Sequence, residues 1–440
     1  MNRHRNPVFV LSLLLALTAA VGQPSPDVSG ERGERVAAAY REGFAAFRKR
    51  DYAGAADIFK KAYDINPGDD ATVYFVAAAY AMGGDKARAV EWLGKLAELK
   101  SCFSPSPVTF ASIADSAEFK AVRQRIAEAA PRAHTSALAF TVGERDLIPE
   151  GIAYDPVERV FYLSSLHKRK IVRVTPGAPG RPAAVEDFTS EGQDGLYCVL
   201  GMKVDARRRV LWAISSAETL MKGFRKEDDG KSALFAYDLR TRRLVKKFAP
   251  PTGGFHLLND LALDRDGRVF ATDTRSNEIF TLSRDGASLQ ILLPAGTVES
   301  PNGIAVSDDG RTLFIASIPQ GVYRFDLKTR QLARLAHPRG ISLVGIDGLY
   351  FYRNSLVGVL NMLNPGRVAR FYLDDALDRV TRTEIVECNN PLFDDPTTAA
   401  LAGGSLYFIA NSQYESAYDR NDAILPTEKL HDVYILKATL

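Results

Sequence analysis

One pattern recurs along the C-terminal part of this 440-residue chain and restricts what the chain can fold into. Residues 300–317 show it most fully, as a polar turn, an alternating strand, an Asp-Asp-Gly turn and a second strand. Copies start at residues 150, 201, 259, 302, 347 and 397, so that successive starts are 43 to 58 residues apart. This period is typical of four-stranded propeller blades rather than of helical or leucine-rich repeats. The sequence therefore predicts a mainly β fold, with a six-bladed β-propeller at residues 137–440.

The copies also keep an internal register. In five of them the starting residue lies fourteen positions before a second marked residue, and these pairs are Glu150 and Ser164, Gly201 and Ser215, Asn259 and Asp273, Asp347 and Asn361, and Thr397 and Asn411. The sixth pair, Asn302 and Ser317, is one residue longer because of its turn. In an up-and-down blade the first strand begins, and the second strand ends, at the same face. These positions are therefore expected to surround one mouth of the central channel.

The residues expected at this mouth are rich in hard oxygen donors, namely Glu150, Asn259, Asp273, Asn302, Asp347, Asn361 and Asn411. Carboxylate and amide oxygens suit calcium, magnesium or manganese better than a metal that prefers sulfur or imidazole. We predict a divalent metal site with Ca²⁺ as the expected ion and Mg²⁺, Mn²⁺ and Zn²⁺ as alternatives. The competing interpretation is structural, because Pro-Glu-Gly, Pro-Asn-Gly and Asp-Gly are also common turn sequences.

Ring closure is predicted to join the two ends of the propeller. The sixth copy contains strands near 397–403, 405–411 and 432–437, and no sequence is left for a fourth. An isolated apolar segment at 137–142 precedes the first copy. We expect this segment to complete the last blade, which removes two open sheet edges.

The N-terminus has the pattern of a secretory signal peptide. Arg3 and Arg5 precede an apolar run at 7–21, and Ala20-Val-Gly22 provides a cleavage site of small residues. Residues 1–22 are therefore predicted to be removed, and the mature protein is expected in the periplasm or outside the cell.

The charges of the mature chain are nearly balanced. Without the two arginines, 54 basic residues face 53 acidic ones, which argues against a nucleic-acid partner. No later stretch is long and apolar enough to predict a membrane span.

A small α-helical domain is predicted at residues 30–132. Gly43, Ala55 and Phe59 recur as Ala77, Ala89 and Leu93 one 34-residue period later, as in tetratricopeptide repeats. A further amphipathic helix at about 115–130 is expected to cover the second repeat. Two repeats form a shallow surface, so a protein partner and a packing role against the propeller both remain open. Cys102, Cys198 and Cys388 show no zinc-site spacing, which leaves one disulfide as an option.

Four motifs in order resemble those of the gluconolactonase and regucalcin (senescence marker protein) family: Pro-Glu-Gly at 149–151, Asn-Asp at 259–260, Pro-Asn-Gly at 301–303 and Asp-Gly at 347–348. The resemblance implies that Glu150, Asn302 and Asp347 ligate the metal. It also implies that Asn259 contacts substrate or metal-bound water, and that Asp347 serves as general base. Leu257 stands where this family often has a substrate-binding arginine, which makes a sugar substrate doubtful.

The sequence predicts a metal-dependent hydrolase that opens a lactone or a related ester, with Asp347 and Asn259 as catalytic residues. Asn259, Asp273, Asn361 and Asn411 are the predicted substrate-binding residues. Two alternatives stay open, a non-catalytic scaffold stiffened by metal and a lyase or dehydratase at the same site. Insertions at 217–231 and 413–431 each follow a second strand, so we expect them to roof the site and set its specificity. His167 and His256 are interpreted as solvated loop residues.

Overall fold

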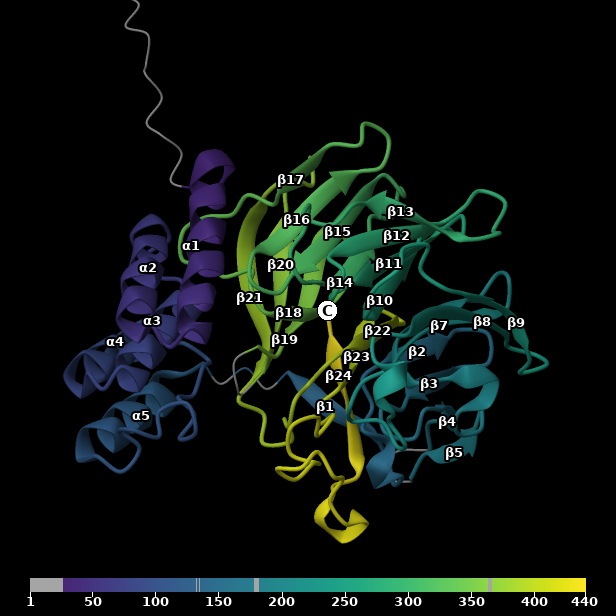
Figure 1. Cartoon of the computed structure of the whole chain (residues 1–440), viewed down its shortest axis with the longest axis horizontal. Helices are drawn as coiled ribbons and strands as arrows, with labels where there is room; N and C mark the ends of the chain where they lie inside the picture. The colour runs from purple at the N-terminus through teal and green to yellow at the C-terminus, as the bar shows by residue number, and fades with distance from the viewer. Residues whose placement is uncertain (1–26, 132, 134, 178–181, 363–365) are drawn as a thin grey trace, which may run out of the picture.

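The computed structural model describes residues 27–131, 133, 135–177, 182–362 and 366–440. The predicted signal peptide at 1–22 lies outside these residues. Within the described residues, twenty-four strands form six antiparallel four-stranded sheets arranged around a central axis (Figure 1). The predicted six-bladed propeller is therefore confirmed, together with a set of helices at its N-terminal side.

Each of the first five blades is built from four consecutive strands. They are β2 (Ile152–Asp155), β3 (Val160–Ser164), β4 (Ile171–Thr175) and β5 (Ala184–Asp187) in blade 1; β6 (Cys198–Asp205), β7 (Val210–Ser216), β8 (Ser232–Asp238) and β9 (Leu244–Phe248) in blade 2; β10 (Leu258–Leu263), β11 (Val269–Asp273), β12 (Glu278–Leu282) and β13 (Leu289–Leu293) in blade 3; β14 (Pro301–Val306), β15 (Thr312–Ser317), β16 (Gly321–Asp326) and β17 (Leu332–Arg334) in blade 4; and β18 (Ile346–Phe351), β19 (Ser355–Leu360), β20 (Arg367–Leu373) and β21 (Val380–Cys388) in blade 5. The first strand of each blade lies next to the channel.

Blade 6 joins the two ends of the propeller, as predicted. Its strand order is β22 (Ala399–Ala402), β23 (Ser405–Ile409), β24 (Val433–Thr439) and β1 (Ser136–Val142). β1 pairs antiparallel with β24 from Ser136 opposite Ala438 to Val142 opposite Val433. The ring is therefore closed by backbone hydrogen bonds between segments almost three hundred residues apart, which leaves β1 as the outer strand of a complete blade.

The helical region contains α1 (Gly30–Arg48), α2 (Tyr52–Ile65), α3 (Asp70–Met82), α4 (Lys86–Glu98) and α5 (Ala117–Ala129). Asp51, Asp69, Asp85 and Ser116 accept hydrogen bonds from the first turns of α2 to α5, which fixes where these helices begin. A Cβ atom at Gly43 would lie 2.6 Å from the Phe59 ring, so the small residue permits the close packing of α1 on α2. Phe119, Val122 and Ile126 of α5 join the same hydrophobic core, which agrees with the expected covering helix.

The helices lie against blades 4 and 5, beside β17 and β21 (Figure 1). Val28 and His337 form a β-bridge, and the Asn66 side chain bonds to the backbone of Gly340 and Ile341 at 2.8 and 3.1 Å. Arg367 of β20 forms a largely buried ion pair with Asp70 of α3 at 2.7 Å. These contacts favour the packing role for this face of the helical region.

In the described part of the chain, no helix combines the length and the apolar character that are needed to cross a membrane.

Candidate metal and substrate site at the channel mouth

A cavity of about 360 Å³ lies where the first strands of the blades begin. Five of the predicted site residues line it, namely Glu150, Asn259, Asn302, Asp347 and Asn361. They come from four blades, so the shared register of the repeats brings them to one place as expected. The predicted metal ligands and catalytic residues are all among these five.

Irregular strand starts aim three of these residues into the cavity. The pairing of the first two strands shifts between Leu258 and Leu261, between Pro301 and Ile304, and between Ile346 and Gly348. Asn259, Asn302 and Asp347 each lie inside such a shift. A β-bulge redirects side chains out of the regular alternation, which explains how residues within a strand reach the channel mouth.

The glycines of the motifs have a separate, structural cause. A Cβ atom at Gly151 would lie 2.1 Å from the Leu200 carbonyl oxygen, and one at Gly303 would lie 2.3 Å from the Asp347 carbonyl oxygen. A Cβ atom at Gly201 would lie 2.8 Å from both the Asn259 carbonyl oxygen and Asp260 Cα. The neighbouring first strands therefore approach so closely that no side chain fits between them. The motifs therefore combine an oxygen donor with a glycine that is required by contact between strands rather than by a turn.

Glu150 and Asp347 are both buried, which strongly affects their protonation. Burial, with repulsion from Asp347 and Asp260, raises the pKa of Glu150 well above its usual range. Burial and the charge of Asp260 raise the pKa of Asp347 to about 7, although hydrogen bonds from Asn361 and Asn302 oppose this rise. Asn361 Nδ2 donates to Asp347 Oδ2 at 2.6 Å. A nearby cation would favour the charged form of both carboxyl groups.

Several oxygens at this site have no hydrogen bond. Glu150 Oε2, Asn259 Oδ1 and Asp260 Oδ2 are buried, and none is paired with any residue that the structure describes. Buried oxygens without a partner are costly, and an absent ion or ordered water is one reason to find them. Within the described ranges, no three His, Cys, Asp or Glu side chains are placed to share a metal ion. A cation here would therefore need amide oxygens in addition to carboxylates, and the Asn259 and Asn302 side chains meet that need.

Two predicted substrate-binding residues do not line the cavity. Asp273 is fully buried and accepts hydrogen bonds from Leu257 N, Ser276 N and the imidazole of His256. Asn411 connects the end of β23 to the start of β24, with bonds to Asp432 O and Tyr434 N. Both side chains hold strand ends together.

His256 is likewise buried, between Asp273 and Thr252 O, so its interpretation as a solvated loop residue was wrong.

Both long insertions reach the rim of the cavity. Glu218 and Leu220 come from the first insertion, and Tyr414 and Glu415 from the second. The two insertions contact each other, because the Tyr418 hydroxyl donates to the Leu220 carbonyl at 3.0 Å. Met221, Phe224, Tyr418 and Leu425 belong to one hydrophobic cluster. Lys222 and Arg225 form ion pairs with Glu191 and Asp228.

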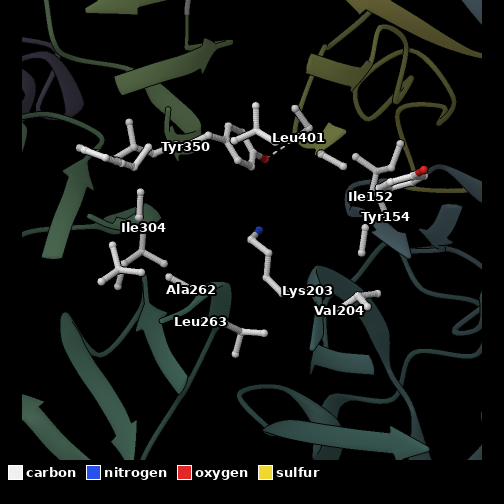
Figure 2. A pocket seen from close by; sticks show the side chains of 16 residues that line it. Ile152, Tyr154, Lys203, Val204, Ala262, Leu263, Ile304, Tyr350 and Leu401 are labelled. Carbon is white, nitrogen blue, oxygen red and sulfur yellow. Dashed lines mark hydrogen bonds between the residues drawn. The ribbon is translucent and has the colours of Figure 1, made fainter. Parts of the chain in front are cut away.

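Sequence reasoning missed the pair formed by Asp260 and Lys203. The Lys203 ammonium lies 3.3 Å from Asp260 Oδ1 and lowers the pKa of Glu150, against the larger effect of burial. Lys203 extends into a second cavity of about 280 Å³ in the channel, beyond the first (Figure 2). The lining around it is mostly apolar and includes Ile152, Ile304 and Leu401 (Figure 2). The sequence does contain a signal for Lys203. This lysine stands two residues after a blade start, where the other blades have Ile152, Leu261, Ile304, Leu349 and Ala399.

The comparisons with known proteins bear on both parts of the chain. Residues 46–100 match the family model described as Tetratricopeptide repeat. A search among curated proteins finds no significant match.

Solved structures similar to this one include the major allergen Mala s 1 of Malassezia sympodialis, with 19% identity, a TM-score of 0.50 and coverage of 69% of this chain and 96% of the allergen. A gluconolactonase from Xanthomonas campestris is 15% identical, with a TM-score of 0.45 and coverage of 69% and 89%. The PQQ-bound aldose sugar dehydrogenase of Streptomyces coelicolor is 14% identical, with a TM-score of 0.46 and coverage of 70% and 99%. At these identities the likeness concerns the fold, and the fold that this chain shares with the allergen is the propeller.

Proposed function

We propose that this protein is a divalent-cation-dependent hydrolase that opens a lactone or a related ester in the cavity at the channel mouth. One observation carries the proposal. Glu150 and Asp347 are buried together with raised pKa values, and unpaired oxygens of Glu150 and Asn259 lie beside the same cavity. Such a cluster is unfavourable by itself and becomes favourable when a cation binds.

The residues at the mouth fit a hard cation. Glu150, Asn302 and Asp347 would hold it, and the oxygen-rich donor set favours Ca²⁺. When bound, the ion would polarise the carbonyl of the substrate and stabilise the negative charge that develops on its oxygen.

The side chains of this chain would supply the proton transfers. A general base must be ionised before it can accept a proton, and the cation would keep the Asp347 carboxylate ionised at neutral pH although burial alone raises its pKa to about 7. Asp347 would take a proton from the attacking water and return it to the alkoxide that leaves when the ring opens. The Asn259 amide donates to Thr274 Oγ1 at 3.0 Å, which orients its oxygen for a water or substrate hydroxyl.

The two insertions would determine which substrates enter. Leu220 and Tyr414 give the rim an apolar character, and Leu257 lines the cavity where the resembled family often has an arginine. An aliphatic or aromatic lactone therefore suits this cavity better than a highly hydroxylated one. The signal-peptide pattern supports the further proposal that the enzyme acts in the periplasm or outside the cell, where free calcium is abundant.

The test combines metal binding with turnover. Purified protein is stripped with a chelator, titrated with Ca²⁺, Mg²⁺, Mn²⁺ and Zn²⁺ by calorimetry, and assayed on aliphatic, aromatic and sugar lactones. We expect calcium binding and calcium-dependent hydrolysis, with a product heavier than the substrate by one water. A product of unchanged or lower mass would indicate the lyase alternative. Calcium binding without turnover on any lactone or ester would indicate the non-catalytic scaffold.

A further inference from the structure

The helical region and the propeller meet at two cysteines that belong to different parts of the chain. Cys102 lies in the segment between α4 and α5, and Cys388 is the last residue of β21. Both side chains are buried, with exposed fractions of 2% and 0%. Their thiols are unbonded here but interact directly with each other, although 286 residues separate them along the chain.

Independent contacts fix this meeting point from both sides. Arg367 of β20 is the register partner of Cys388, and its guanidinium lies 4.4 Å from the centre of the Phe103 ring. The same guanidinium pairs with Asp70, which also accepts a hydrogen bond from Ser101 Oγ at 2.8 Å. Ser101 and Phe103, which flank Cys102, are therefore both connected to Arg367, Ser101 through Asp70 and Phe103 directly. Arg367 in turn lies opposite Cys388. Local shifts of the two elements would have to break a buried ion pair.

The segment that links the two domains holds Cys388 from a third direction. The Cys388 amide donates to the Ala133 carbonyl at 3.2 Å, and its thiol lies 3.5 Å from the Pro131 carbonyl oxygen. Pro131, Cys102 and Arg367 line one small cavity of about 160 Å³ at this junction. Cys102 therefore borders a small space at the junction, while Cys388 is held by the linking segment beside it.

We propose that Cys102 and Cys388 form a disulfide that covalently fixes the helical domain to blade 5 of the propeller. The third cysteine has a different setting, because Cys198 lies in the core of blade 2 among apolar side chains. Cys198 stays a free thiol in this proposal.

The electronic environment assigns a role to each sulfur. The hydrogen bond from Cys102 and the nearby charge of Arg367 lower the pKa of Cys388, while the same hydrogen bond and burial raise the pKa of Cys102. The thiolate is the attacking species in thiol–disulfide exchange, so contact between the two cysteines makes Cys388 the more reactive of the pair. By contrast, burial raises the pKa of Cys198 to about 12, which makes that thiol inert.

The oxidant is a disulfide, either a small molecule such as oxidised glutathione or the disulfide of an oxidoreductase. The Cys388 thiolate attacks one sulfur of this disulfide, and one thiolate leaves. The Cys102 thiolate then attacks Cys388 in the mixed disulfide, and the second thiolate leaves. The protein loses two electrons and two protons, and the oxidant is reduced to two thiols. Because both cysteines are buried after docking, we expect the bond to form as the domains come together and to be protected afterwards.

The experiment counts free thiols in the full chain. The protein is produced in the periplasm of an expression host, quenched with N-ethylmaleimide, denatured without reductant and weighed by intact mass spectrometry; a cytoplasmic sample provides the reduced reference. We expect one alkylated cysteine in the periplasmic protein, three in the reference, and a linked peptide that contains Cys102 and Cys388. Three alkylated cysteines, a link that includes Cys198, or a glutathione adduct on Cys388 would each overturn the proposal.

A stability measurement separates the cross-link from mere packing. Reductant should lower the Tm of the oxidised protein on the order of 5 °C, because the bond restricts a very long loop of the unfolded chain. The variant Cys198→Ala should keep this response to reductant. The variant Cys102→Ala/Cys388→Ala should lose it, whatever its own Tm is. A double variant that still responds to reductant would contradict the proposed pair.

Discussion

The side-chain amide of Asn361 donates a 2.6 Å hydrogen bond to Oδ2 of Asp347. Asp347 stands at the start of the first strand of blade 5, and Asn361 directly follows the second strand. The bond orients the carboxylate and partly offsets the rise in its pKa that burial causes. Asp347 is thereby held in one orientation beside the cavity, with a pKa that allows both protonation states near neutral pH.

The first prediction concerns this carboxylate. Asp347→Asn should reduce calcium-dependent lactone turnover by at least roughly 100-fold, because it removes the general base and one charge from the cation site. The amide keeps the size of the side chain, so the circular dichroism spectrum should stay native. Asp309→Asn, in the hairpin turn of blade 4, makes the same chemical change outside the cavity and should leave turnover unaffected. An Asp347→Asn protein with parental turnover would exclude Asp347 as the base.

A second prediction links pH to calcium. The folded-state pKa of Asp347 is about 7 and thus above its ordinary value of 3.8, so the apo protein should lose stability as pH rises from about 4 to 7. Calcium binds the ionised form and should reverse this loss above pH 7. The increase in Tm on adding calcium should be small at pH 5 and large at pH 8, as differential scanning fluorimetry can show.

The calcium affinity should follow the same titration. Below pH 7 it should weaken by roughly tenfold for each pH unit if one proton is displaced per ion. Calorimetry in buffers of different ionisation enthalpy would measure that proton directly. An affinity that does not change between pH 5 and 8 would contradict the assignment of Asp347 as a ligand.

The third prediction tests Lys203. Replacing it by methionine leaves Asp260 without its ion pair and removes a charge that lowers the pKa of Glu150. The pH midpoint of calcium binding should therefore move upward. Lys246→Met, at the surface of blade 2, removes the same charge far from the channel and should leave the midpoint in place. A midpoint that moves downward would show that repulsion between Lys203 and the ion dominates.

A fourth prediction concerns the domain interface. Asp70→Asn should destabilise the protein by about 3 kcal/mol, because it leaves the buried guanidinium of Arg367 without a counter-charge. The double variant Asp70→Asn/Arg367→Met should be more stable than Asp70→Asn alone, since the uncompensated charge is then gone. Chemical denaturation of the parent, both single variants and the double variant measures this coupling. Equal losses in Asp70→Asn and in the double variant would show that the pair contributes packing rather than charge.

How much the sequence could predict depended on whether a feature repeats. The blade period and the fourteen-residue interval are local and recur, so they were sufficient to predict six sheets, the closure by residues 137–142 and the meeting of Asp347 with Asn361. Asp273 has the same register as Asn361, yet it turns to His256 and the backbone. Register predicts which end of a strand a residue occupies, whereas the direction of its side chain depends on neighbours from other segments.

Features that occur once were harder to predict. Lys203 and Asp260 join two blades, and Cys102 and Cys388 join the helical domain to the propeller. No repeated spacing in the sequence marks either pair. The bulges that aim Asn259, Asn302 and Asp347 interrupt the pairing of the first two strands of a blade, and the residue pattern of one strand does not reveal such an interruption. Lys203 stood out against apolar residues at equivalent positions, and that contrast was the one usable signal.

The closure of blade 6 by β1 and β24 couples the two ends of the propeller during folding. The partner of β1 lies at residues 433–439, so β1 has no strand to pair with until those residues are in place. Until then β1 is an open sheet edge, which is prone to pair with another chain. The five other blades consist of consecutive strands and can form in that state, but the ring cannot close. A chain without residues 433–439 would therefore form an open arc of blades rather than a smaller propeller.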